Sequence, residues 1–377
     1  MMRIEELEVF RIGMPLKAPF RSALGEERIV ETIFLRLRWG GVEGWGEVTP
    51  QARPSYSPEW AAGVFRVIRD CLGPLLAGRP IGSGQDIQSM LSGVRGNYFA
   101  KAAIDIAWWD AYARSRGEPA WKVLGGSEPE AMVGADIPLQ ADTDALVEAV
   151  GQAVDEGYRR LKLKVTREAP ERQLAAVRAA FPDIVIHVDC NGAFSLDDLP
   201  RIRALDHFDL AMLEQPLAFD DLVDHAALQK HLDVGICLDE SITSAARARK
   251  AIEIGACRWI NIKAGRVGGV TEALAIHGLC EKAGMPVWIG SMLESNLGQA
   301  VSLALATLPN VQYGSDIFPH GTFYATDICE PEMRLSGPSS MRAGDDPGFG
   351  WQPDISMLRA HLIERASVSM KSEGWAS

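Results

Sequence analysis

The sequence predicts an α/β protein in which a smaller N-terminal α+β unit precedes a series of βα units around a parallel sheet. Three observations lead to this prediction. Residues 33–48 alternate between two faces on either side of a Gly-Gly pair. From residue 126 onward, short apolar runs alternate with amphipathic segments, and charged residues recur at the ends of these runs. Alternation with a period of two indicates strands, and regular strand–helix alternation indicates βα units.

The N-terminal unit contains one predicted hairpin and two predicted helices. The hairpin covers residues 33–48, with its turn at Gly40-Gly41. Residues 57–72 and 99–116 have the periodicity of helices. Gly117 follows the second helix as a typical stop signal.

Eight short apolar runs follow the break at residues 125–129. The runs that we expect to form strands are 133–140, 159–165, 184–189, 210–216, 235–240, 258–263, 286–290 and 311–316. Eight strands suit a closed barrel at least as well as an open sheet, and their spacing alone does not decide between the two. We therefore expect three parts: an α+β unit at 1–125, the βα units at 126–330, and a C-terminal segment at 331–377 that packs back on the first unit.

Composition favours a small-molecule function. The 377 residues include 38 Lys and Arg against 50 Asp and Glu, a formal net charge of −12, which disfavours nucleic acid and anionic membranes as partners. Charge interrupts every apolar run at the start of the chain, so we expect no signal peptide or membrane span and a cytoplasmic location. The six cysteines form no C-x-x-C pair, as expected of free thiols in a reducing compartment.

Five charged residues stand near the ends of successive predicted strands. They are Lys164, Asp189, Glu214, Asp239 and Lys263, separated by 25, 25, 25 and 24 positions. In a barrel this spacing would place all five around one mouth, with the two lysines facing each other. Three carboxylates without histidine or thiolate partners favour a hard metal ion. We expect Mg²⁺, and Mn²⁺ could replace it. The alternative is a set of separate structural salt bridges.

A lysine has an ordinary pKa near ~10.4, so a catalytic base needs neighbours that disfavour its protonated form. Lys162 shares a strand face with Lys164, and its charge would have this effect. Arg266, three residues after Lys263, could act in the same way there. The alternative for Lys162 is an ion pair with a barrel acid, and the two interpretations can both hold.

Together the motifs resemble the enolase superfamily, in its muconate-lactonizing branch, and within it the N-acylamino acid racemases and o-succinylbenzoate synthases. The segments that carry the resemblance are KLK at 162–164, HVDCN at 187–191, EQPL at 214–217, LDES at 238–241, NIKAGRVGG at 261–269 and GSMLES at 290–295. The resemblance implies an N-terminal α+β capping domain over a (β/α)7β modified TIM barrel. It also implies a homo-oligomer that acts on a small-molecule carboxylate.

The resemblance divides the charged residues of the mouth into roles. It implies an acid/base pair, Lys164 and Lys263, with electrostatic support from Lys162 and Arg266. It also implies a bound magnesium ion with the ligands Asp189, Glu214 and Asp239. Asn191 and Glu240 would be hydrogen-bond partners of these ligands.

The implied reaction removes a proton next to a carboxylate and passes through an enediolate. Two bases on opposite faces would make an N-acylamino acid (N-succinylamino acid) racemase, whereas one base and loss of water would make an o-succinylbenzoate synthase, and both remain open. The residues that we expect in the substrate pocket are Phe20, Arg21, Ser291, Met292, Asp316 and Ile317.

Three alternatives rank lower. Dipeptide epimerases of this branch carry a D-x-D pair after strand eight, whereas Asp316 here is followed by Ile317 and Phe318. Cycloisomerases of the same branch are a second alternative. A non-catalytic binding barrel is a third, disfavoured because five charged groups in one cluster are costly to bury without a metal.

Overall fold

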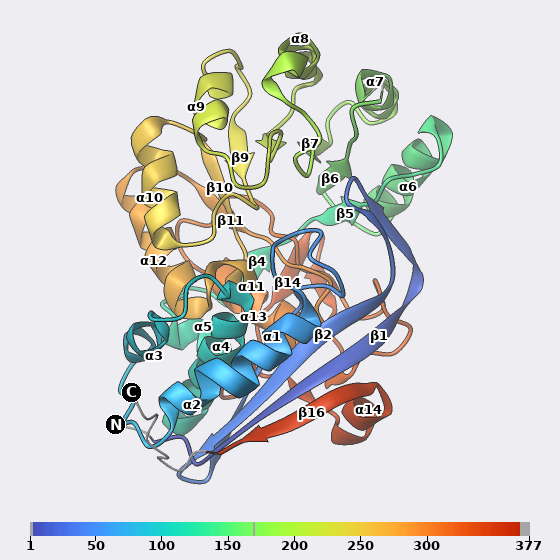
Figure 1. Cartoon of the computed structure of the whole chain (residues 1–377). Coiled ribbons are helices and arrows are strands. Elements are labelled where there is room, and N and C mark those ends of the chain that lie inside the picture. The colour runs from blue at the N-terminus through green and yellow to red at the C-terminus, as the bar shows by residue number, and fades with distance from the viewer. Residues whose placement is uncertain (1–2, 169, 370–377) are drawn as a thin grey trace.

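The computed structural model describes residues 3–168 and 170–369. Figure 1 shows two connected parts, a capping domain built on a long antiparallel ribbon and a barrel whose helices lie outside its strands. Within the described residues, no helix is long and apolar enough to cross a membrane.

The capping domain is built on a four-stranded antiparallel sheet in the order β16-β1-β2-β3. Its strands are β1 (Glu6–Ser22), β2 (Gly25–Trp39), β3 (Val42–Val48) and β16 (Leu362–Val368). The predicted hairpin is confirmed, since Trp39 pairs with Val42 and Ile33 with Val48 around the glycine turn. The C-terminal strand β16 adds to the free edge of β1, so the end of the chain returns to this domain.

Helices cover one face of this sheet. They are α1 (Ala61–Val67), the π-helical turn η1 (Ile68–Leu72), α2 (Gly73–Leu76), α3 (Gly84–Leu91), α4 (Tyr98–Arg116) and α5 (Ala120–Val123). The second predicted helix is confirmed as α4, and Gly117 ends it in a left-handed conformation with φ +66°. The first predicted helix was placed four residues too early, because Pro58 disfavours helical backbone in the residue before it. The loop that precedes α1 instead enters the mouth of the barrel.

Seven parallel strands form one curved sheet in the order β11-β10-β9-β8-β7-β6-β5. They are β5 (Ala135–Ile137), β6 (Arg160–Lys164), β7 (Val185–Asp189), β8 (Leu213–Glu214), β9 (Ile236–Leu238), β10 (Trp259–Ile262) and β11 (Val287–Ile289). The eighth predicted run closes the ring through single parallel bridges, Val311 to Val287 on one side and Ser315 to Val133 on the other. The barrel is therefore closed, which the spacing alone had left open.

Helices alternate with these strands. They are α6 (Thr143–Asp155), α7 (Pro170–Ala180), η2 (Leu196–Asp198), α8 (Leu199–Ala204), η3 (Leu205–Phe208), α9 (Val223–Gln229), α10 (Ala245–Ile254), α11 (Ala264–Val267), α12 (Val270–Lys282) and α13 (Asn296–Ala306). The remaining short elements are β4 (Glu130–Met132), β12 (Cys329–Glu330), β13 (Leu335–Gly337), β14 (Ser340–Arg342), β15 (Gln352–Pro353) and α14 (Ile355–Ala360). The domain boundaries at residues 125 and 330 stay a prediction.

Buried acids of the capping domain dock it onto the barrel. Glu47 of β3 accepts hydrogen bonds from the backbone N–H groups of Ser295 and Gly298, at the start of α13. Asp105 of α4 accepts from the N–H of Thr271 at the start of α12. Each carboxylate thus satisfies helix N–H groups that have no partner inside the helix. These contacts hold the cap over the C-terminal ends of the barrel strands.

Candidate active site

The two lysines of β6 point into the barrel because strand side chains alternate between two faces. In the parallel register Lys162 lies beside His187, and Lys164 lies beside Asp189. Lys162 is almost completely buried, at 1% exposure, whereas Lys164 is partly exposed and lines a cavity. The same face continues inward to Arg160, which is also buried.

The three carboxylates end three adjacent strands. Asp189 lies beside Glu214 in the β7–β8 register, and Asp239 directly follows β9, the next strand of the ring. All three are buried, and each is paired with a cation. Lys162 Nζ lies 2.9 Å from both Asp189 Oδ2 and Glu214 Oε2. The predicted convergence on one strand-end arc is therefore present, with a lysine ammonium group between two of the acids.

The charge of Lys162 is neutralised on every side. A third acid, Asp316, lies 3.2 Å away and is held from below by Arg160 at 2.7 Å. Burial lowers the pKa of Lys162, but the negative charges of Asp189 and Glu214 outweigh it and raise the pKa well above the ordinary value. Of the two interpretations of Lys162, the structure shows the ion pair with barrel acids.

Lys263 stands opposite, at the end of β10. Its Nζ donates to Asp239 Oδ2 at 2.9 Å and lies 4.7 Å from the ring centre of Tyr56. Burial lowers the pKa of Lys263, but nearby acidic groups raise it above its ordinary value in this arrangement. The lowered pKa expected at Lys263 is not seen in this arrangement, because the hydroxyl of Tyr56, followed by the carboxylates of Glu214 and Glu240, favours the ammonium form.

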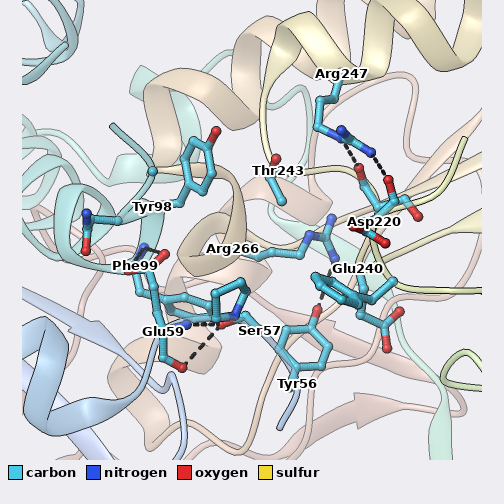
Figure 2. A pocket seen from close by; sticks show the side chains of 15 residues that line it. Tyr56, Ser57, Glu59, Tyr98, Phe99, Asp220, Glu240, Thr243, Arg247 and Arg266 are labelled. Atoms are coloured by element: carbon cyan, nitrogen blue, oxygen red, sulfur yellow. Dashed lines mark hydrogen bonds between the residues drawn. The ribbon is translucent and has the colours of Figure 1, made fainter. Parts of the chain in front are cut away.

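Arg266 and Tyr56 complete this side of the mouth (Figure 2). The guanidinium of Arg266 donates to Asp239, to Tyr56 Oη at 3.3 Å and to the carbonyl of Asn261. Tyr56 Oη donates to Asp239 Oδ1 at 3.0 Å. The sequence did not single out Tyr56, because its partner Asp239 lies 183 residues away.

Three more residues of the site were missed, although their positions carried a signal. Arg160 and Asn261 stand two residues before Lys162 and Lys263, respectively, on the same strand faces. Asp136 lies on β5, the strand that precedes β6 in the barrel. Asn261 donates to Glu214 at 2.8 Å, and Asp136 lies 3.8 Å from Lys164 Nζ. Applying the two-residue alternation to every strand would have found the first two.

A cavity of about 50 Å³ lies between the two lysines. Of the predicted pocket residues, Phe20, Ser291 and Met292 line it. Arg21 instead pairs with Glu26 at the surface. Asp316 and Ile317 are not among its lining residues, because Asp316 is bound by Arg160 and Lys162 beneath the cavity and Ile317 is fully buried.

A second cavity, of about 170 Å³, lies on the other side of Tyr56 (Figure 2). Its walls include the rings of Tyr98 and Phe99, and Glu59 accepts from the backbone N–H of Phe99. Tyr56 lines both cavities, and Glu240, on the wall of the larger one, accepts from Asn191 on the wall of the smaller one at 3.0 Å. The two cavities thus share Tyr56 and are linked through the Asn191–Glu240 hydrogen bond.

The donor chemistry of the mouth fits a hard cation. The candidate ligands are all carboxylates, and three further buried oxygens, Glu240 Oε2, Asp136 Oδ1 and Asn261 Oδ1, have no hydrogen-bond partner among the described residues. Such oxygens are the ligands that Mg²⁺ prefers. Within residues 3–168 and 170–369, however, no three acidic, histidine or cysteine side chains are grouped to hold a metal ion in this arrangement, in which Lys162 Nζ lies 2.9 Å from both Asp189 and Glu214.

A cap whose loops close the mouth of a βα barrel, with lysines and carboxylates at successive strand ends, defines an enzyme of the enolase superfamily. Residues 4–125 match the mandelate racemase / muconate lactonizing enzyme N-terminal domain, and residues 145–357 match the enolase C-terminal domain-like model. The chain belongs to the mandelate racemase / muconate lactonizing enzyme family. The predicted fold and class of enzyme are thereby confirmed.

Relatives and solved structures agree with this assignment. The chain is 41% identical to an o-succinylbenzoate synthase of Geobacillus stearothermophilus, over 93% of this chain and 94% of the relative. It is 40% identical to an N-succinylamino acid racemase of Thermus thermophilus, over 97% and 98% of the two chains. An enolase superfamily member from Listeria innocua superposes with a TM-score of 0.94 at 34% identity, covering 98% of this chain and all of the other.

Proposed function

We propose that the protein removes the proton next to the carboxylate of an N-acylamino acid and returns it from the opposite face, as an N-succinylamino acid racemase. The observation that carries the proposal is that Lys164 and Lys263 line the same cavity from β6 and β10. These strands are the second and sixth of the eight-stranded ring, so they stand opposite each other. A substrate α-carbon between them would present one face to each lysine.

The metal ligands in this proposal are Asp189, Glu214 and Asp239. Bound Mg²⁺ would supply positive charge at the substrate carboxylate and hold the charge of the enediolate. Because the lysines now pair with the same oxygens, the ion and the ammonium groups compete for them. A bound cation would offset the charge of Glu214, one of the groups that favour the ammonium form of Lys263, and would thereby help this lysine to accept a proton.

The remaining residues hold this arrangement. Asn191 accepts from Lys164 at 3.3 Å and donates to Glu240, so it links the base to the next loop of the ring. Arg266 fixes Asp239 and the Tyr56 hydroxyl. Phe20, Ser291 and Met292 are the proposed contacts to the acyl or amino acid part of the substrate.

A second activity, o-succinylbenzoate synthase, uses the same site. Loss of water with a single base needs Lys164 but not Lys263, and both activities appear in the names of relatives at similar identity. Dipeptide epimerisation ranks lower, because Asp316 is bound by Arg160 and Lys162 and is not placed to hold a substrate amino group. Cytoplasmic location and homo-oligomeric assembly stay predictions.

The test is α-proton exchange. The protein is incubated with Mg²⁺ and N-succinyl amino acids of each configuration in D2O, and the α-proton signal is followed by NMR. Exchange of both enantiomers supports the racemase. Absence of exchange with every N-acylamino acid contradicts it, and formation of o-succinylbenzoate in a parallel assay would then assign the synthase alone.

A further inference from the structure

Gln215, the residue after Glu214, is fully buried and adopts a left-handed backbone conformation with φ +38°. Residues other than glycine, asparagine and aspartate rarely adopt this conformation, because their side chains crowd the backbone. Asn191, which adopts φ +42° in the loop after β7, is a residue type suited to it. A glutamine at such a position indicates that its side chain does something that glycine or asparagine cannot do.

The side-chain amide of Gln215 connects two loops of the mouth. Its Oε1 accepts from the backbone N–H groups of Asp239 at 3.0 Å and Ser241 at 3.3 Å. Its Nε2 donates to the hydroxyl of Ser241 at 2.7 Å and to the carbonyl of Ala218 at 3.0 Å. The amide therefore binds the loop after β9 to the loop after β8.

The backbone of Gln215 reaches the third loop. Its carbonyl accepts from the N–H of Gly192 at 2.8 Å, in the loop that follows Asp189. Its own N–H donates to the carbonyl of Cys237 at 2.9 Å, on β9. Gln215 is thus joined to the backbone at the ends of all three strands that place a proposed metal ligand.

We propose that Gln215 is a positioning residue that sets the relative placement of the three proposed metal ligands, and thereby the affinity of the site for a divalent cation. The proposal rests on the proposed function in that it takes Asp189, Glu214 and Asp239 as the ligands. Gln215 acts through the backbone of these loops, and the hydrogen bonds that its side chain makes among the described residues go to the loops after β8 and β9. Because it spans adjacent strand ends, its loss lets the three carboxylates shift independently of one another.

The chain offers a matched control for Gln215 at the opposite end of strand β9. Gln229, the last residue of α9, is also buried, and its amide accepts from the N–H of Ile236 at 2.7 Å and donates to the carbonyl of Val234 at 3.1 Å. Gln215 therefore holds β9 at its catalytic end, and Gln229 holds it at its opposite end. A general loosening of β9 would follow from losing either amide, whereas misplaced ligands would follow only from losing Gln215.

The experiment measures Mn²⁺ affinity by electron paramagnetic resonance and thermal stability by calorimetry, in the full chain and three variants. Gln215→Asn and Gln215→Gly suit the left-handed backbone, but neither side chain reaches Asp239, so we expect each to bind Mn²⁺ at least tenfold more weakly. Gln229→Ala is expected to lower the melting temperature and leave Mn²⁺ affinity within twofold. Having both Asn and Gly variants protects the test against one of them failing to fold.

Either of two results in the variants overturns the proposal about Gln215: Mn²⁺ affinity within twofold of the unchanged chain in the Gln215 variants, or an equal loss of affinity in Gln229→Ala. Absence of Mn²⁺ binding to the unchanged chain overturns it as well. Failure of the proposed reaction is a separate outcome, in which the unchanged chain binds Mn²⁺ but exchanges no α-proton. Whether or not the unchanged chain exchanges the α-proton, the Mn²⁺ affinities of the variants decide whether Gln215 positions the metal ligands.

Discussion

Lys164 and Lys263, the two lysines at the mouth of the barrel, each stand at the end of a strand, but their side chains contact different parts of the protein. Lys164 is bonded to Asp189 and Asn191, both of the barrel. Lys263 lies between Asp239 of the barrel and the ring of Tyr56, which the capping domain supplies. The capping domain therefore helps to position Lys263, whereas barrel residues hold Lys164. Mutations in the cap should for this reason affect the two lysines separately.

Removal of Lys164 should have the largest effect, because both candidate reactions require it. We expect Lys164→Ala to lower α-proton exchange and synthase activity together by about three orders of magnitude, the middle of the range for a general base. Activity assays with Mg²⁺ and NMR in D2O measure the two losses. If either activity survives, Lys164 is not the shared base.

Removal of Lys263 should impair racemisation but not the synthase reaction. Since each lysine faces one side of the α-carbon, Lys263→Ala should stop exchange of one N-succinyl amino acid enantiomer and leave exchange of the other by Lys164. Exchange of each pure enantiomer in D2O measures this selectivity, with o-succinylbenzoate formation as the internal control. Equal exchange of both enantiomers in this variant would rule out the two-base arrangement.

Tyr56→Phe should have a smaller effect, confined to the Lys263 side. The ring that faces Lys263 remains, but Asp239 loses one hydrogen bond and Arg266 loses one acceptor. A hydrogen bond to a charged group contributes about 1.5–3 kcal/mol, so we expect the Lys263-dependent exchange to fall by about tenfold or more. The Lys164-dependent exchange should stay within twofold.

Tyr158→Phe serves as the matched control for the loss of a hydroxyl. Tyr158 is also buried, but it lies outside both cavities of the site, so its variant should leave the exchange of both enantiomers unchanged. A fall in both exchange rates with Tyr56→Phe would show that the cap supports the whole mouth, and that Lys164 depends on the cap as Lys263 does.

The sequence predicted those parts of the site that depend on regular strand alternation. Lys162, Lys164 and Asp189 could be found because one strand face and one βα period relate them. Tyr56 and the pairing of Arg160 with Asp316 could not be found in this way, because these contacts join residues 183 and 156 positions apart, through loops without a fixed period. The pairing of Lys162 with three acids likewise depends on where each side chain settles in the closed ring.

The docking of the cap should show the smallest effect on catalysis and a distinct effect on stability. Glu47 is fully buried where β3 meets α13, and burial raises its pKa to about 8, with the nearby Glu294 and Asp327 adding to the shift. Its folded-state pKa lies above the value of 4.5 in the unfolded chain, so the folded state holds this proton more tightly. The stability that this proton contributes is present below pH 4.5 and is lost as the pH rises toward 8.

Glu47→Gln removes this titration while keeping an oxygen that can accept from the N–H groups at the start of α13. The free energy of unfolding of the unchanged chain should therefore fall relative to the variant by about 1.4 kcal/mol per pH unit between pH 5 and 8. Urea unfolding at several pH values measures the difference between the two chains. A parallel pH dependence in both would contradict a protonated Glu47 in the docked cap, while unchanged exchange of both enantiomers would confine its effect to stability, away from both lysines.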